Sequence, residues 1–300
     1  MKHTICLLIS FLLLFSIGNS FSIAHENNTI YVDDDGGADY TTIQDAIDAA
    51  IDGDTIFVYE GVYYESLTIE KSLHIQGENK HETIIDKTND SNIHIVSINH
   101  PNVHFEGFTL IDTDELFIDA AAVISVKSDN NIIEHTIIKT NLYYGIKIHP
   151  QTKENTIQHN YITSLFACIR LEKSLNNHIF NNYMVGRNTG MDAHYAFNNI
   201  IERNHFENKG IGVFFVACHG NTFSQNNFIN YGDDVYLQPH VSCNTWESNY
   251  WQHYQETLPF YIVTLRHIPF TEIPLVFWFD ILRIDWNPAN EPYDISEVMK

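Results

Sequence analysis

The chain has 300 residues, of which 44% are hydrophobic, 13% aromatic and only 18% charged, a composition that excludes a disordered chain and suffices for a large core. Its 38 acidic and 16 basic residues give a formal net charge of −22. Such a surface repels phosphate groups, so nucleic acid and anionic lipid are not expected partners, whereas cations and neutral glycans are compatible with it.

The first residues have the pattern of an export signal. Lys2 precedes an apolar run over residues 5–17, which is too short to span a bilayer comfortably. Small residues give two cleavage points, after Ala24 or after Ser20, and an uncleaved membrane anchor is the third alternative. We assign residues 1–24 to this signal peptide and expect a protein that is secreted, extracellular or at the cell surface, without a later membrane span.

Residues 25–52 are predicted to form a strand and a short helix that caps the first coil of the domain. Thr41 and Gln44 make a capping-box pattern, apolar residues follow at helical spacing, and Asp52-Gly53 ends the run. Three aspartates at residues 33–35 stand beside two glycines ahead of this helix. They leave calcium binding open, but the spacing of an EF-hand is absent and a solvated loop is the simpler interpretation.

A repeat of about 22 residues dominates the chain from residue 124 to residue 251. An apolar residue restarts the pattern at spacings of 22, 23, 22, 22 and 22, and a second apolar residue follows two positions later, as in a strand with one buried face. The restart residues are Ile124, Ile146, Ile169, Met191, Val213 and Val235. Similar but less regular strands are expected between residues 55 and 105.

Asparagine recurs at two places in each coil. The first column comprises Asn131, Asn155, Asn177, Asn199, Asn221 and Asn244, and the second comprises Asn160, Asn182, Asn204, Asn226 and Asn249. An amide side chain both donates and accepts, so like residues stacked at about 4.8 Å can form hydrogen-bonded ladders. We therefore interpret these asparagines as turn and stacking residues. The fold class predicted is all-β, a right-handed parallel β-helix of about nine coils over residues 53–251.

After residue 251 the repeat stops, and residues 252–300 are predicted to form a C-terminal cap or tail. This segment is rich in aromatic residues and proline. A cap folded over the last coil is the simpler interpretation, and a contact with a partner or the envelope through residues 275–279 is the alternative.

Several of these segments resemble the NosD-like, carbohydrate-binding and sugar-hydrolase group of right-handed parallel β-helix repeat proteins, in particular secreted archaeal members. The similar segments are Ile30–Val32, Thr41–Gly53, Gly53–Ile56, Tyr59–Tyr63, Asn249–Trp251, Ile284–Pro288 and Glu291–Ile295. The resemblance covers nearly the whole mature chain and implies the β-helix architecture. It implies no single activity, because the group mixes binding proteins, polysaccharide-processing enzymes and a copper-site maturation factor.

The second and fourth positions of the main strands are expected to point outward by alternation. Over three adjacent coils they carry a mixed-charge patch, and aromatic residues continue it on the next two coils. The candidate ligand-binding residues are Lys147, His149, Arg170, Glu172, Asp192, His194, Phe214 and Tyr236. The basic residues suit an acidic sugar and the aromatic rings suit sugar stacking, whereas a solvated face of salt bridges is the alternative without function.

Three functions stay open on the sequence alone. The first, which we favour, is an exported, non-catalytic protein that binds a polysaccharide or envelope glycan or serves as a scaffold. The second is a polysaccharide lyase, epimerase or hydrolase acting on an acidic glycan; a hydrolase needs two carboxylates, for which Glu172 and Asp192 are the nearby candidates. The third is a copper-binding maturation factor, with His149, Glu172 and His194 as weak candidate ligands. The sequence assigns no catalytic residue and requires no cofactor.

Overall fold

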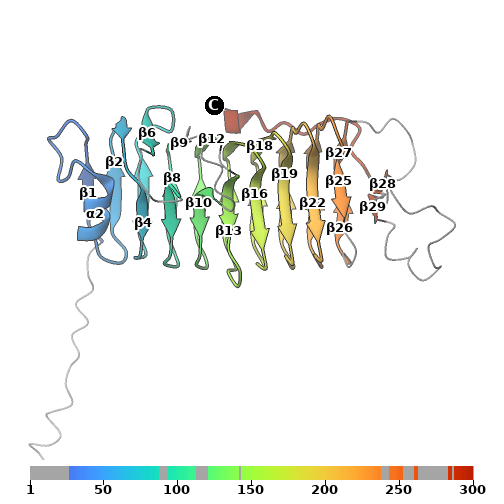
Figure 1. Cartoon of the computed structure of the whole chain (residues 1–300), viewed down its shortest axis with the longest axis horizontal. Helices are drawn as coiled ribbons and strands as arrows, with labels where there is room; N and C mark the ends of the chain where they lie inside the picture. The colour runs from blue at the N-terminus through green and yellow to red at the C-terminus, as the bar shows by residue number, and fades with distance from the viewer. Residues whose placement is uncertain are drawn as a thin grey trace, which may run out of the picture.

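The structure, a computed structural model, describes residues 27–87, 94–112, 121–141, 143–237, 243–252, 260–262, 283–285 and 287–299. The predicted signal peptide, residues 1–24, and residues 275–279 lie outside the described residues. Within them the chain forms an elongated stack of coils built from three parallel sheets (Figure 1). The predicted parallel β-helix is confirmed. Among the described residues, no helix has the length and apolarity needed to cross a bilayer.

Each coil gives one short strand to each sheet, so strands that are neighbours in a sheet come from successive coils. The ten-stranded sheet comprises β1 (Thr29–Val32), β2 (Thr55–Val58), β5 (His74–Gly77), β8 (His104–Glu106), β11 (Ile132–Glu134), β14 (Thr156–Gln158), β17 (His178–Phe180), β20 (Ile200–Glu202), β23 (Thr222–Ser224) and β26 (Thr245–Glu247). The eight-stranded sheet comprises β4 (Leu67–Ile69), β7 (Val96–Ile98), β10 (Ala122–Val126), β13 (Tyr144–Ile148), β16 (Ala167–Glu172), β19 (Thr189–His194), β22 (Ile211–Val216) and β25 (Val235–Leu237). The nine-stranded sheet comprises β3 (Gly61–Tyr63), β6 (Thr83–Asp86), β9 (Thr109–Asp112), β12 (Ile137–Thr140), β15 (Tyr161–Ser164), β18 (Tyr183–Gly186), β21 (His205–Phe206), β24 (Asn227–Phe228) and β27 (Tyr250–Trp251).

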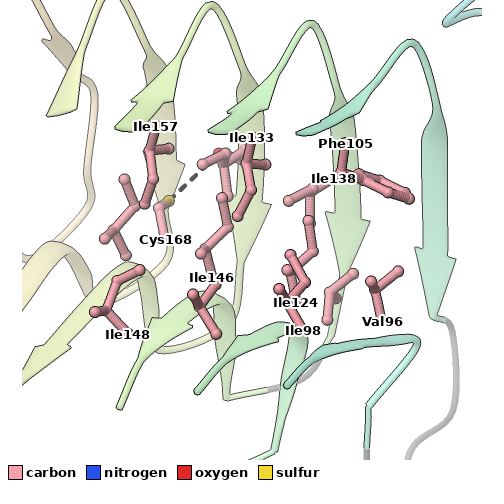
Figure 2. Packing of buried hydrophobic residues seen from close by; sticks show 14 of the residues in the cluster. Val96, Ile98, Phe105, Ile124, Ile133, Ile138, Ile146, Ile148, Ile157 and Cys168 are labelled. Carbon is pink, nitrogen blue, oxygen red and sulfur yellow. Dashed lines mark hydrogen bonds between the residues drawn. The ribbon is translucent and has the colours of Figure 1, made fainter. Parts of the chain in front are cut away.

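The core is a set of apolar columns that run through the stack. Ile124 pairs in register with Ile146, and Ile146 pairs with Ile169, as the restart positions predicted. Figure 2 shows Ile133 and Ile157 of successive coils directed into the interior, where both are fully buried. Because each apolar residue contacts its counterparts above and below, the core is continuous along the whole solenoid.

Both predicted asparagine columns form hydrogen-bonded ladders. The Oδ1 of Asn204 accepts hydrogen bonds from the backbone N and the Nδ2 of Asn182, both at 3.0 Å. Its Nδ2 donates to Asn226 Oδ1 at 3.1 Å and to the carbonyl of Ile179 at 2.8 Å. Every member of the two columns is at most 9% exposed. The amides therefore satisfy buried backbone groups at the corners of the coils.

A buried carboxylate ends the second ladder. The antiparallel pair of β28 (Phe260–Ile262) and β29 (Arg283–Asp285) includes Asp285, which is 0% exposed. Asp285 Oδ2 accepts from the backbone N of Asn249 at 2.9 Å, from its Nδ2 at 3.0 Å and from Trp251 Nε1 at 3.2 Å. Asp285 Oδ1 accepts from the backbone N of Ser248 at 3.0 Å. The carboxylate thus takes the place of the asparagine that a further coil would supply.

A short helix stands at the other end of the stack, as predicted. This helix, α2, spans Ile43–Ala49. The predicted capping box is wrong, because the N-cap is Thr42, whose side chain accepts from Asp45 N at 3.3 Å. The side chain of Gln44 instead accepts from the backbone N of Thr68 in the first coil.

Two charged side chains from the coil beneath hold the ends of α2. The Glu65 carboxylate accepts from the backbone N of Ile43 and of Gln44, both at 2.8 Å. The Lys71 ammonium donates to the carbonyls of Ile47, Asp48 and Ala50 at 2.9, 2.7 and 2.7 Å. An anion at the N-terminus and a cation at the C-terminus both match the helix dipole and its unpaired backbone groups.

Replacing Asn204 by alanine is expected to destabilise the protein by about 2–4 kcal/mol, because the backbone and side-chain groups that it serves would stay buried without partners. The midpoint and slope of urea unfolding measure this loss. Asn141→Ala, at an exposed position, is the matched control and is expected to change the free energy of unfolding by less than about 0.5 kcal/mol. Equal stability of Asn204→Ala and the control would contradict the structural role of the ladder.

Candidate functional site

The predicted outward column of the eight-stranded sheet has the expected register. Lys147 pairs with Arg170, Arg170 with Asp192, and the column continues to Phe214 and Tyr236. In the neighbouring outward column of the same sheet, Glu172 pairs with His194. His149 directly follows β13, and its backbone N donates to the carbonyl of Val126 at 2.9 Å. The eight candidate residues therefore lie on one face of one sheet.

Part of the charged face is buried, whereas the side chains of Glu172 and His194 are 30% exposed. Lys147 is 9% exposed, Arg170 8% and Asp192 2%. The ring of Tyr144 lies beside both cations, with its centroid 5.8 Å from Lys147 Nζ and 5.8 Å from Arg170 Cζ. Tyr144 belongs to a small apolar cluster with Ala122 and Ala167 that is separate from the main core. The outward cations are therefore desolvated under a second apolar layer.

The buried charges neutralise one another across the coils. Lys147 Nζ lies 3.2 Å from Glu172 Oε2, and Arg170 Nη1 donates to Asp192 Oδ2. Asp192 Oδ1 lies 3.1 Å from His194 Nε2. Burial acts to raise the pKa of Glu172, but Lys147 and then Arg170 outweigh it, so the pKa lies below its usual value. Glu172 is thus held as a carboxylate and is poorly suited to donate a proton.

His149 is held in its neutral form. Its Nε2 lies 2.9 Å from the hydroxyl oxygen of Ser125, which is fully buried. Burial, followed by the charges of Lys147 and Lys127, lowers the pKa of His149 from 6.5 to about 4. A neutral imidazole beside a buried hydroxyl forms a stable hydrogen bond across two coils.

The three weak metal candidates on this face do not form a ligand group. His149 bonds Ser125, while Glu172 pairs with Lys147 and His194 with Asp192. Within the described part of the chain, the cluster that brings three metal-type ligand atoms within 4.8 Å of one another is His74, His104 and Glu106. The sequence analysis missed this cluster.

His74, His104 and Glu106 lie on the outer face of the ten-stranded sheet. His74 and His104 pair in register on β5 and β8, and their rings stack with centroids 4.4 Å apart and planes 8° apart. Glu106 Oε1 lies 2.8 Å from His74 Nε2 and 3.9 Å from His104 Nε2. His104 Nε2 also lies 2.7 Å from Glu134 Oε1 on the next coil. The side chains are about one fifth to one third exposed, so solvent reaches the cluster.

Alternation along the strands explains why these side chains face outward. Ile75 and Phe105 are fully buried, so the residues on either side of them in β5 and β8 point to solvent. The hydrogen bond from His74 is the main reason that the pKa of Glu106 lies below its usual value, which keeps the carboxylate ionised. The cluster thus presents two imidazole nitrogens and a carboxylate oxygen.

This donor set fits a transition-metal ion. Imidazole suits copper and zinc, and both ions accept a carboxylate oxygen as a further ligand. Glu134 Oε1 lies 2.7 Å from His104 Nε2, the same nitrogen that lies 3.9 Å from Glu106 Oε1, so Glu134 can supply a further oxygen ligand beside the cluster. The parallel β-helix matches the family described as periplasmic copper-binding protein (NosD) over residues 47–257, a range that includes the whole cluster. The chain belongs to the NosD family.

Other comparisons of this NosD-family chain concern its fold. No curated protein matches the chain. A pectin methylesterase from carrot is 13% identical, with 73% of this chain and 81% of that chain covered and a TM-score of 0.54. A pectin methylesterase mutant in complex with a hexasaccharide is 14% identical, with 78% and 92% covered and a TM-score of 0.54. The catalytic domain of Agl-KA is 14% identical, with 68% and 42% covered and a TM-score of 0.52. At these identities the likeness is one of fold.

The aromatic end of the predicted patch differs from its charged end. Phe214 and Tyr236 are half-buried, and their rings stack with centroids 5.3 Å apart and planes 6° apart. The ring of Phe214 also lies 5.8 Å from that of His194. Together the two stacked, partly accessible rings form an apolar patch beside the buried ion pairs.

The aspartate loop that left calcium binding open has backbone partners. Asp33 Oδ1 accepts from the backbone N of Asp35 at 3.1 Å, and Asp34 Oδ2 accepts from Val62 N at 3.0 Å. The same loop covers the edge of β1, since Asp39 Oδ2 accepts from the backbone N of Tyr31 at 2.9 Å. These bonds give the carboxylates a structural use in closing the exposed sheet edge.

Arg170→Ala is expected to destabilise the protein by about 3–5 kcal/mol, because Asp192 would be left buried without the cation that neutralises it. This differs from the small effect expected for a solvated pair. A double-mutant cycle with Asp192→Ala, measured by chemical unfolding, tests the coupling, and the double variant is expected to regain part of the loss. Additive losses in the cycle would show that the two groups do not interact.

Acid sensitivity of the fold is expected to depend on His149. Its pKa is lower in the folded protein than in the unfolded chain, so the unfolded chain binds more protons between pH 6.5 and about 4. Stability is therefore lost as the pH falls through this range. His149→Gln can keep the bond to Ser125 but cannot titrate, so its melting temperature is expected to drop less between pH 7 and pH 4.5 than that of the wild type. An equal drop in both proteins would contradict this assignment.

Proposed function

We propose that this NosD-family chain is an exported β-helix protein that binds a transition-metal ion of the copper or zinc type through His74, His104 and Glu106. The observation that carries the proposal is the convergence of three ligand atoms within 4.8 Å on a solvent-accessible sheet face. The family description as a periplasmic copper-binding protein supports both the metal and export, and the N-terminal signal pattern supports export. We extend this to a location outside the cell or at its surface.

The surroundings of the cluster favour a cation. The chain carries a formal net charge of −22, which raises the local concentration of positive ions at its surface. Glu106 and Glu134 contribute two carboxylates beside the two imidazoles, so a bound divalent ion would be close to charge balance. The sheet holds the ligands on rigid strands, which reduces the entropy lost when a metal binds.

The metal-free full-length protein is expected to bind about one equivalent of Cu²⁺ or Zn²⁺ in isothermal titration calorimetry, and His104→Ala to weaken binding by at least about tenfold. Binding is expected to weaken at acidic pH, since imidazole ligands must be neutral. His178→Ala is the matched control, because His178 pairs with Glu202 at 2.9 Å on the same sheet but outside the cluster. Equal affinities of the His104→Ala variant and the wild type would contradict the site.

A second candidate function is non-catalytic glycan binding on the face of the eight-stranded sheet. The two partly accessible rings of Phe214 and Tyr236 form an apolar patch against which a sugar ring can pack. One structural neighbour was solved with a hexasaccharide, which supports a glycan as a ligand of this fold. A binding role fits better than a lyase, epimerase or hydrolase, since Arg170 and Asp192 are engaged in a buried ion pair and Glu172 is held ionised.

Replacing both Phe214 and Tyr236 by alanine is expected to abolish retention on a glycan array of acidic and neutral polysaccharides without changing the circular dichroism spectrum. Tyr231→Ala, which removes a ring that is 80% exposed elsewhere, is the control. Product analysis on the retained glycans separates binding from turnover. Cleaved or desaturated products would replace the binding role with the enzymatic one, and unchanged retention in the double variant would exclude this face.

A further inference from the structure

The last residues of the chain turn back along the solenoid. Residues 287–299, here called the C-terminal strap, run over one corner of the stack toward its N-terminal end (Figure 1, red). Ala289 forms a parallel bridge with Tyr250 on the last coils, and the backbone N of Tyr293 and its carbonyl both bond the side chain of Asn227 at 2.8 Å. Farther along, the carbonyl of Val298 accepts from Lys80 Nζ at 3.2 Å. The strap therefore links early and late coils.

Two apolar side chains and a phenol fasten the strap. Ile295 and Val298 are 8% and 3% exposed, and Tyr293 Oη donates to the carbonyl of Ser248 at 2.7 Å. Between the strap and the corner lies a half-open cavity of about 350 Å³. This volume lies within the range of small-molecule sites.

The floor of the cavity consists of the residues that precede successive ladder asparagines. His159, Asn181, Arg203 and Gln225 stand at equivalent turn positions of four coils, each with φ between 51° and 55°. The ladder holds their backbone in place, because the next residue of each coil is a buried asparagine. The floor is thus a rigid row of polar side chains, one per coil.

The two sides of the cavity have opposite hydrogen-bonding character. Arg203 Nε donates to Gln225 Oε1 at 2.8 Å, which orients the guanidinium on the floor. Glu297 and Asp294 of the strap line the opposite side, and Asp294 Oδ1 also accepts from the backbone N of Ser296 at 2.9 Å. The side chains of Arg203, Asp294 and Glu297 are exposed, so donors of the floor and acceptors of the strap are both accessible to a ligand. Two cations, Arg203 and the Lys80 that bonds the carbonyl of Val298, therefore lie beside two carboxylates.

This arrangement selects a class of ligand. Because cations and carboxylates are equal in number, neither an anion nor a cation is favoured, and a purely apolar molecule would leave the polar floor desolvated and unpaired. A hydroxyl group both donates and accepts, so a molecule with several hydroxyls can satisfy Arg203 and Glu297 together. We propose that the cavity under the C-terminal strap binds a neutral, hydroxyl-rich saccharide, at a site separate from both the metal cluster and the Phe214–Tyr236 face.

Calorimetric titration of the full-length protein with cellobiose, maltose and mannobiose tests the proposal, with digalacturonate as the acidic comparison. At least one neutral disaccharide is expected to bind, and Arg203→Asn is expected to weaken it at least tenfold. Asparagine tolerates the left-handed backbone at this position, so the variant removes the guanidinium without straining the turn. Arg187→Asn, at an exposed position outside the cavity, is expected to change the affinity by less than twofold.

A second variant protects the test against misfolding. Glu297→Gln, at an exposed position of the strap in the full chain, removes a carboxylate from the other side of the cavity, and it is expected to weaken saccharide binding while the circular dichroism spectrum stays unchanged. His178→Ala, outside both the cavity and the metal cluster, is expected to leave the saccharide affinity unchanged. The Arg203→Asn variant and the wild type are expected to bind Cu²⁺ with the same affinity, which separates this site from the metal cluster. Loss of disaccharide binding in the variant that lacks both Phe214 and Tyr236, with wild-type binding in Arg203→Asn, would assign the saccharide to the Phe214–Tyr236 face instead. No binding of any neutral disaccharide, tighter binding of digalacturonate, or wild-type affinity in Arg203→Asn would each overturn the proposal.

Discussion

The stacking of buried side chains determines where every other side chain of this protein lies. An asparagine such as Asn204 bonds the coil below through Oδ1 and the coil above through Nδ2, at 3.0 and 3.1 Å. Because a strand reverses its faces with a slip of one residue, any slip between coils would expose core residues and leave these amides unpaired. The ladders therefore fix the register of the later coils. In the earlier coils, which precede Asn131, the buried pair Ile75 and Phe105 fixes the register that places His74 over His104.

The structure could be predicted from the sequence most accurately where the repeat is most regular. Between residues 124 and 251 the coils differ by one or two residues in length, so the columns of Ile146 and Asn204 could be aligned from the sequence alone. His74 and His104 are 30 residues apart, because longer connections interrupt the early coils, and this spacing hid their stacking. The cluster is detectable only once the strand triplets around Ile75 and Phe105 are aligned as neighbours.

The exposure of the charged patch could not be predicted, for a different reason. Simple alternation along β10 and β13 predicted that Lys147 points to solvent, and it does point away from the main core. However, Tyr144 also leaves the core on the same face, three residues earlier, and its ring covers the cations of two coils. Whether an outward charge is solvated depends on such side chains from neighbouring coils, which no periodicity reports. Partly accessible ionisable groups lie on both sheets, but on the ten-stranded sheet three of them converge, which favours that face for a metal ion.

The same physical requirement governs both ends of the solenoid. Both ends carry unpaired backbone N–H groups, and carboxylates accept them here, Glu65 at the first turn of α2 and Asp285 at the last coil. Asp285 can do so because β29 lies against the last coil. The strap that follows Asp285 is therefore a continuation of the end closure, and its path along the corner creates the half-open cavity beside Arg203. A ligand site at this corner would thus arise from the way the fold terminates its own hydrogen bonding.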